Sequence, residues 1–129
     1  MINIVMDTNI IVSAALSPTG NPAKIIARIS NDEEIQFFYS TQIFNEYRRV
    51  LAYERLNISL EKQNALIKAI KKLGIKTDPP TSTIPMPDET DRTFYDTAKA
   101  SGAMLVTGNI KHYPAEPFII TPVEFLDQY

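Results

Sequence analysis

The residues of this sequence that suggest chemistry are three carboxylates and one amide, placed where structural elements are expected to begin or end. Asp7 directly follows the first apolar run, Asp91 opens an expected helix, Glu46 lies in the second turn of another, and Asn109 follows a later apolar run. Carboxylates gathered within a few ångströms repel one another unless a cation lies among them. Mg²⁺ or Mn²⁺ in such a site can activate a water and neutralise a phosphodiester, so these residues predict hydrolytic phosphodiester cleavage.

Each of the three acids also has an ordinary structural explanation. Asp7 could be a polar end to a strand or a helix cap, and Asp91 a first-turn acid favoured by the helix dipole. Glu46 lies roughly 100° from the centre of the apolar stripe of its helix, where it could pair with Arg49 at helical spacing. These alternatives stay open for each acid taken singly, and the three together are less easily explained in this way.

Strand-like and helix-like segments alternate along the whole chain. Short runs rich in β-branched and aromatic residues predict strands, and apolar side chains at three- and four-residue spacing predict helices. Polar caps mark the expected helix starts at Asn21 with Pro22, at Ser40 or Thr41, at Ser59 and in a capping box from Thr121 to Glu124, and Gly74 and Gly102 are expected to end helices. The expected strands are 2–6, 35–39, a short one from Ile75, 103–107 and 118–120; the expected helices are 10–16, one from 21–22, one from 40–41 to 51, 60–73, 91–101 and one after 121, with a loop of four prolines over 77–90.

This alternation predicts a single α/β domain over residues 1–129, built as three αβα layers. Strands separated by helices favour right-handed crossovers and a central parallel sheet that is covered on both faces. In such a sheet the carboxyl ends of the strands and the starts of the following helices lie along one edge, where ligands bind. Asp7, Glu46, Asp91 and Asn109 are all expected at that edge.

Composition and charge exclude several functions. With no cysteine and a single histidine, His112, the chain cannot form disulfides or the zinc sites that depend on Cys and His ligands. A net charge of −2 means that any contact with nucleic acid must be local, and the lysine-rich stretch 62–76 is more simply a solvated helix face. No apolar run is long enough to span a bilayer and no basic leader precedes the first strand, so we expect a cytoplasmic protein that does not enter a membrane.

Five segments, taken in this order, resemble the PIN-domain nucleases, in particular the branch of toxin components from toxin–antitoxin pairs. The resemblance covers nearly the whole chain, and its specificity comes from the order of the segments. It implies a Rossmann-like PIN fold, an endoribonuclease that depends on Mg²⁺ or Mn²⁺, an RNA substrate, frequent homodimers and, in toxin members, an antitoxin partner. The segments are VMDTNIIVSA at 5–14, STQIFNEYRRVL at 40–51, PDETDRTFYDTA at 87–98, AMLVTGNIKHY at 103–113 and IITPVEFL at 119–126.

The same resemblance assigns roles to individual residues. It implies that Asp7 is the central metal ligand and that Glu46 and Asp91 complete the catalytic acidic set. The family usually places a fourth acid after "TG", where this chain has Asn109, which offers a neutral oxygen to a metal but no charge. This departure weakens the case for a second metal. Accessory residues implied in the same way are Thr8 and Asn9, which support the turn, and Asp88 as a further acid. Thr107 either contacts substrate or only ends a strand, and the resemblance favours the contact.

Three other functions can be compared with this prediction. A phosphatase with an aspartyl nucleophile needs a second acid two residues after Asp7, where this chain has Asn9. A dinucleotide-binding domain has a glycine-rich fingerprint after its first strand, and this sequence has none there. The remaining alternative is a degenerate domain that binds RNA or a partner without catalysis, which Asn109 favours. Metal binding at the carboxylates, and its loss in Asp7→Asn, would separate this alternative from the nuclease.

Overall fold

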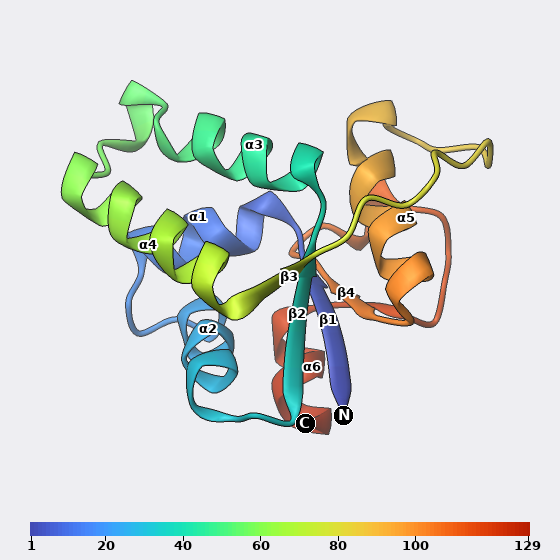
Figure 1. Cartoon of the computed structure of the whole chain (residues 1–129), viewed down its shortest axis with the longest axis horizontal. Coiled ribbons are helices and arrows are strands. Elements are labelled where there is room, and N and C mark those ends of the chain that lie inside the picture. The colour runs from blue at the N-terminus through green and yellow to red at the C-terminus, as the bar shows by residue number, and fades with distance from the viewer.

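A computed structural model describes residues 1–129 as five strands and six helices, joined in part by short 3₁₀ turns. The strands form one parallel sheet in the order β3-β2-β1-β4-β5 (Figure 1). The expected three-layer α/β class is therefore confirmed. The strands are β1 (Ile2–Met6), β2 (Ile35–Tyr39), β3 (Gly74–Lys76), β4 (Met104–Val106) and β5 (Ile119–Ile120); the helices are α1 (Thr8–Leu16), α2 (Asn21–Asn31), α3 (Thr41–Leu51), α4 (Leu60–Leu73), α5 (Arg92–Ser101) and α6 (Pro122–Gln128); the turns are η1 (Glu54–Leu56), η2 (Glu89–Asp91) and η3 (Ile110–His112).

The central strand β1 is apolar on both of its faces. Ile4 and Val5 point to opposite faces and neither is exposed, because helices cover the sheet on each side. Figure 1 shows α5 on one side of the sheet and α1, α2 and α4 on the other, and no helix is long and apolar enough to cross a membrane. The pairing of Met6 with Val106 places the residues that follow β1 and β4 next to each other at one edge.

The predicted helix caps are largely confirmed. The side chains of Ser40 and Ser59 accept hydrogen bonds from the third residues of α3 and α4, and Thr121 forms the expected capping box with Glu124. These are interactions over three residues, so the local sequence is enough to predict them. The N-cap of α2 was predicted wrongly: Gly20 occupies that position, and Asn21 is already helical.

Strand and helix ends differ from the prediction by a few residues. The helix α1 begins at Thr8, directly after Asp7, rather than at residue 10. The strands β4 and β5 are shorter than expected, at 104–106 and 119–120. The early start of α1 matters for the site, because it leaves no loop between β1 and the helix and so restricts the position of Asp7.

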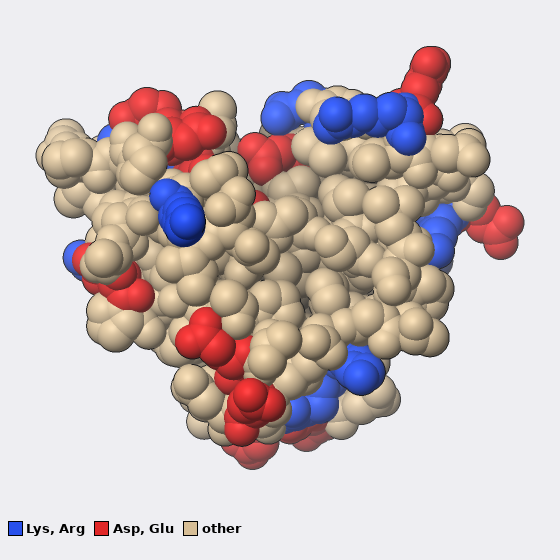
Figure 2. Space-filling model, turned by 180° about the vertical axis from the view of Figure 1, so that it is seen from behind, with Lys and Arg blue, Asp and Glu red and all other residues tan.

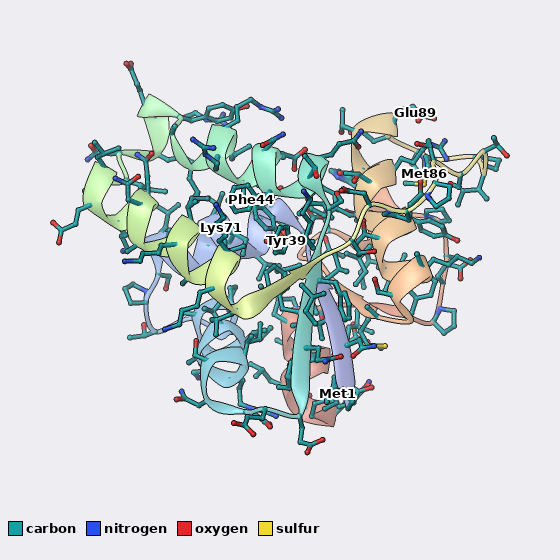
Figure 3. The ribbon with its side chains drawn as sticks, viewed as in Figure 1. Met1, Tyr39, Phe44, Lys71, Met86 and Glu89 are labelled. Atoms are coloured by element: carbon teal, nitrogen blue, oxygen red, sulfur yellow. The ribbon has the colours of Figure 1, made fainter.

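The two glycines predicted to end helices do so for different reasons. Gly102 has a φ of 59°, the left-handed conformation that glycine adopts without steric cost. Gly74 is extended, with a φ of −87°, but a β-carbon there would lie 2.6 Å from the ring of Tyr39. That ring packs against Phe44 with a centroid distance of 5.5 Å (Figure 3). A side chain at position 74 would therefore clash with Tyr39, so glycine is needed at the junction between α4 and β3.

Candidate active site

Asp7 is buried at the carboxyl end of β1, with 6% of its surface exposed. It occupies the N-cap position of α1, yet its side chain makes no capping hydrogen bond. Its Oδ2 instead accepts hydrogen bonds from Thr107 Oγ1 at 2.8 Å and from the Tyr113 hydroxyl at 2.9 Å. Asp7 is therefore the N-cap residue by position, but its side chain does not cap the helix, and Oδ1 has no protein hydrogen bond.

Glu46 extends from the second turn of α3 toward the start of α1. The Thr8 hydroxyl donates a hydrogen bond to Glu46 Oε2, across 38 residues of sequence. Glu46 Oε1 lies 3.8 Å from Arg49, whose side chain is 62% exposed while that of Glu46 is 20% exposed. Burial, with a smaller contribution from the charge of Asp7, raises the pKa of Glu46. The surface ion pair exists, and the carboxylate nevertheless faces Thr8 and Asp7.

Asp91 lies at the junction of η2 and α5. Its side chain makes no capping hydrogen bond, and Oδ2 is buried with no hydrogen-bond partner. Burial raises the pKa of Asp91 to about 6, and repulsion from Asp7 is the next cause. A buried, unpaired carboxylate oxygen facing other acids is an unfavourable arrangement unless a cation joins it.

Asn109 lies at the same edge, but its amide is used by a neighbour. The amide nitrogen is 2.8 Å from Nε2 of His112, the last residue of η3. The other ring nitrogen of His112, Nδ1, lies 3.6 Å from Asp91 Oδ2. The side chain that was expected to replace the fourth acid therefore contacts the imidazole, and the imidazole faces Asp91.

Thr107 and Asn9 organise the turns around Asp7. Asn9 Oδ1 accepts from the Gly108 backbone N–H at 3.1 Å, which ties the turn after β1 to the loop after β4. The Thr107 hydroxyl donates to Asp7 and accepts from the Asn109 backbone N–H at 3.0 Å. No part of Thr107 is exposed, and its hydroxyl positions Asp7; a contact with substrate stays a prediction.

Asp88, the accessory acid, shapes η2. It accepts hydrogen bonds from the Thr90 backbone N–H at 3.0 Å and from the Thr90 hydroxyl at 2.8 Å. These bonds lower the pKa of Asp88, although its charge still contributes to the raised pKa of Asp91. Asp88 is exposed and therefore stands at the rim of the acidic edge.

Comparison with known proteins identifies the family. The family model described as PIN domain matches residues 3–111. The chain belongs to the PIN-domain family. An uncharacterised protein of Methanocaldococcus jannaschii is 31% identical over 111 residues, which cover 84% of this chain and 71% of that protein. PIN domains are generally nucleases that use divalent metal ions, so membership supports a nuclease role in general.

A solved structure confirms the fold of this PIN domain. A chain from the VapBC2 structure of Rickettsia felis, bound to a DNA fragment from its promoter, superposes with a TM-score of 0.58. The match covers 93% of this chain and 97% of that chain, at 17% sequence identity. At this identity the likeness establishes the shared fold, and no residue role is transferred through it.

The donor set of this PIN domain suits a hard divalent cation that keeps part of its water. No group of three or more Asp, Glu, His or Cys side chains is close enough to surround a metal ion. Mg²⁺, however, is usually bound through one or two carboxylates with several waters retained. The unpaired Asp91 Oδ2 and the free Asp7 Oδ1 are oxygens of this kind. The residues therefore fit a partly hydrated ion, bound from one side.

Hollows adjoin the acidic edge. A polar hollow of about 480 Å³ lies between the start of α3 and the segment 78–96 and includes Glu89 and Thr90 of η2. A shallower one of about 370 Å³ includes Asn9, Gly108 and Asn109. Figure 2 shows a notch at the upper edge of the molecule, with Asp and Glu side chains beside it and Lys and Arg side chains along one rim.

Sequence reasoning missed two residues of the site, Tyr113 and His112. From the sequence alone, no role in the site was assigned to either residue. Both follow the "TG" segment closely, and that position was the only available signal. Their partners, Asp7 and Asp91, lie far away in the sequence, so only the folded chain reveals the contacts.

Proposed function

We propose that this PIN domain is an endoribonuclease that hydrolyses RNA phosphodiester bonds with the help of Mg²⁺ or Mn²⁺. The observation that carries the proposal is the arrangement of Asp7, Glu46 and Asp91 at one sheet edge, where the charge of Asp7 raises the pKa of both other acids. Structural acids are normally spread out or paired with cations, because like charges in a partly buried site are costly. Three carboxylates at the ligand-binding edge of an α/β sheet, of which only Glu46 has an arginine nearby, favour a metal site.

The side chains at the acidic edge have different roles in this proposal. Thr107 and Tyr113 hold Asp7 Oδ2, which leaves Oδ1 as the oxygen that would bind the ion. Asp91 and Glu46 add charge beside it and accept protons near neutral pH more readily than ordinary carboxylates. A bound divalent ion would supply charge neutralisation at the phosphate and a more acidic water.

Arg49 gives the site a cation on the solvent side. Its side chain is exposed and lies 3.8 Å from Glu46, so it is available to a phosphate that approaches the acids. An arginine can bind phosphate oxygens through two hydrogen bonds, and this offsets the repulsion between an RNA backbone and the acids. The Lys and Arg side chains on the rim in Figure 2 support the same approach.

We further propose that the protein is cytoplasmic, is a single domain over 1–129, and acts as the toxin of a toxin–antitoxin pair, as a homodimer with an antitoxin partner. The sequence resemblance is the main support for the toxin role, and the VapBC2 neighbour, itself part of a complex, is consistent with it. A second candidate is a non-catalytic module that binds RNA or a protein. The neutral Asn109 and the absence of a closed three-ligand group favour that candidate.

The test is an RNA cleavage assay with structured and single-stranded RNAs, and a matched DNA, in Mg²⁺, Mn²⁺ or EDTA. We expect RNA to be cleaved only when Mg²⁺ or Mn²⁺ is present. In Asp7→Asn the cleavage rate should fall by about two orders of magnitude or more. Asp127→Asn is the control, because it removes an exposed acid on α6, away from the site. Cleavage that is indifferent to both metal and Asp7 would contradict the mechanism. Wild-type inactivity that Asn109→Asp restores would support the degenerate module instead.

A further inference from the structure

The one histidine of the chain lies at the acidic edge. His112 Nδ1 is 3.6 Å from Asp91 Oδ2, and Nε2 is 2.8 Å from the Asn109 amide. The imidazole is half exposed, at 52%, whereas Asp91 is 13% exposed. One ring nitrogen is therefore held by a neutral side chain while the other faces an acid that has no hydrogen-bond partner on that oxygen.

We propose that His112 is a metal ligand in this protein: its Nδ1 and Asp91 Oδ2 bind the same divalent ion, and the imidazole makes the site prefer Mn²⁺ to Mg²⁺. The inference rests on the proposed metal-dependent function and adds to it. It also gives Asn109 a different role from the one expected, because Asn109 orients the histidine and does not itself bind the ion.

The separation of the two atoms fits a shared ion. Two ligand atoms that are each bonded to one ion at roughly 2.1 Å can lie up to about 4.2 Å apart. The distance of 3.6 Å between Nδ1 and Oδ2 is within this range, and it is longer than an ordinary N–H···O hydrogen bond. Oδ2 is buried and has no hydrogen-bond partner, so the ion would supply the charge that it lacks.

The contact with Asn109 is of the kind that metal-binding histidines have. Such histidines usually donate the N–H of their second nitrogen to a nearby acceptor, which sets the ring orientation and leaves the first nitrogen free for the metal. Asn109 lies within hydrogen-bond distance of Nε2. In the structure the amide nitrogen faces Nε2. Our proposal requires the Asn109 amide to turn by 180°, so that its oxygen accepts from Nε2–H and the Nδ1 lone pair faces the ion. An aspartate at 109 would accept the same bond but would add charge; the amide avoids that charge.

The choice of metal follows from the nitrogen donor. Mg²⁺ and Mn²⁺ both suit carboxylate and water oxygens. Mn²⁺ is the softer of the two, as a first-row transition-metal ion, and accepts one imidazole nitrogen beside its oxygen ligands more readily than Mg²⁺ does. A site made only of carboxylates would discriminate weakly between the two. With His112 as a ligand, we expect Mn²⁺ to bind more tightly than Mg²⁺, and the difference to shrink on the order of tenfold in His112→Gln.

The experiment is pulsed electron paramagnetic resonance of Mn²⁺ bound to the full chain near neutral pH, with Mn²⁺ and Mg²⁺ affinities measured by calorimetry. We expect a nitrogen coupling from imidazole in the wild type and its absence in His112→Gln. Lys111→Gln, an exposed neighbour in η3, is the matched control and should keep the coupling. Circular dichroism checks that the variants fold. The nitrogen coupling in the wild type is a test of the proposal that does not depend on any variant folding.

Failure of this inference can be told apart from failure of the proposed function by assaying RNA cleavage on the same samples. Metal-dependent cleavage with bound Mn²⁺ but no nitrogen coupling would overturn the role of His112 and leave the nuclease standing. Nitrogen coupling without any cleavage would support the ligand and count against the nuclease. Failure to bind Mn²⁺ at all would overturn both.

Discussion

The Tyr113 hydroxyl donates a hydrogen bond of 2.9 Å to Asp7 Oδ2, joining two buried residues that are 106 positions apart. Burial and the nearby charge of Asp7 raise the pKa of Tyr113, so the hydroxyl keeps its proton and remains a donor at every ordinary pH. Thr107 donates to the same oxygen at 2.8 Å. These two donors compensate the burial of one carboxylate oxygen and leave the other available.

Tyr113→Phe is expected to lower the free energy of unfolding by about 1 to 3 kcal/mol at pH 7. The reason is that a buried carboxylate loses one of two hydrogen bonds while the aromatic ring stays in place. Urea denaturation measures the change. Tyr53→Phe, in an exposed ring, is the control and should stay within about 0.5 kcal/mol of the wild type. Equal stability of Tyr113→Phe and the wild type would mean that the contact does not compensate the burial of Asp7.

Asp91→Asn is expected to stabilise the metal-free protein at pH 7.5. The pKa of Asp91 is about 6 in the folded chain against 3.8 ordinarily, so the folded state holds this proton more tightly than the unfolded state. Wild-type stability therefore falls as pH rises from about 4 to about 6, by about 1 to 2 kcal/mol after allowance for solvent screening. Asparagine at position 91 carries no charge at either pH, so the variant should not lose this stability as the pH rises.

Denaturation in EDTA at pH 4 and pH 7.5 tests this expectation. The two proteins should be nearly equally stable at pH 4 and differ at pH 7.5. Asp88→Asn is the control: hydrogen bonds from Thr90 lower the pKa of Asp88, so its replacement should bring no gain at pH 7.5. A loss of stability in Asp91→Asn at pH 7.5 would show that the carboxylate acts mainly as a helix-end stabiliser.

Added Mg²⁺ or Mn²⁺ is expected to raise the unfolding temperature more at pH 7.5 than at pH 5. An ion that binds only the folded chain stabilises it by about 2.7 kcal/mol at one hundred times its dissociation constant. At pH 5, below the pKa of about 6, the ion must displace a proton from Asp91. Thermal unfolding with and without metal measures both shifts, with Asp7→Asn as the variant that should lose them. Equal shifts at the two pH values would place the ion away from Asp91.

Gly74→Ala is expected to cost about 1 to 3 kcal/mol of stability without changing the chemistry of the site. The new β-carbon would lie 2.6 Å from the Tyr39 ring, so the end of α4 must move away from β2. Gly102→Ala has open space around it and should cost about 1 to 2 kcal/mol, through its left-handed backbone alone. Chemical denaturation compares the two variants. A neutral Gly74→Ala would show that the ring moves aside freely.

The sequence by itself determined the elements, their order and the edge at which the acids meet. Apolar periodicity and helix caps act over three or four residues, so Ser40, Ser59 and the Thr121 capping box could be predicted from neighbours alone. Alternation of strands and helices restricts the sheet to parallel crossovers, and this placed Asp7 and Asn109 at one edge before any contact was known.

Only the tertiary structure decided which side chains meet at that edge. The bonds of Asp7 to Tyr113 and of Thr8 to Glu46, and the approach of His112 to Asp91, join residues whose separation is set by sheet order and helix packing. No local pattern encodes these distances, because a shift of one residue along a helix turns a side chain by about 100°. The same reason explains why the crowding at Gly74 appears only when α4, β2 and β3 are packed together.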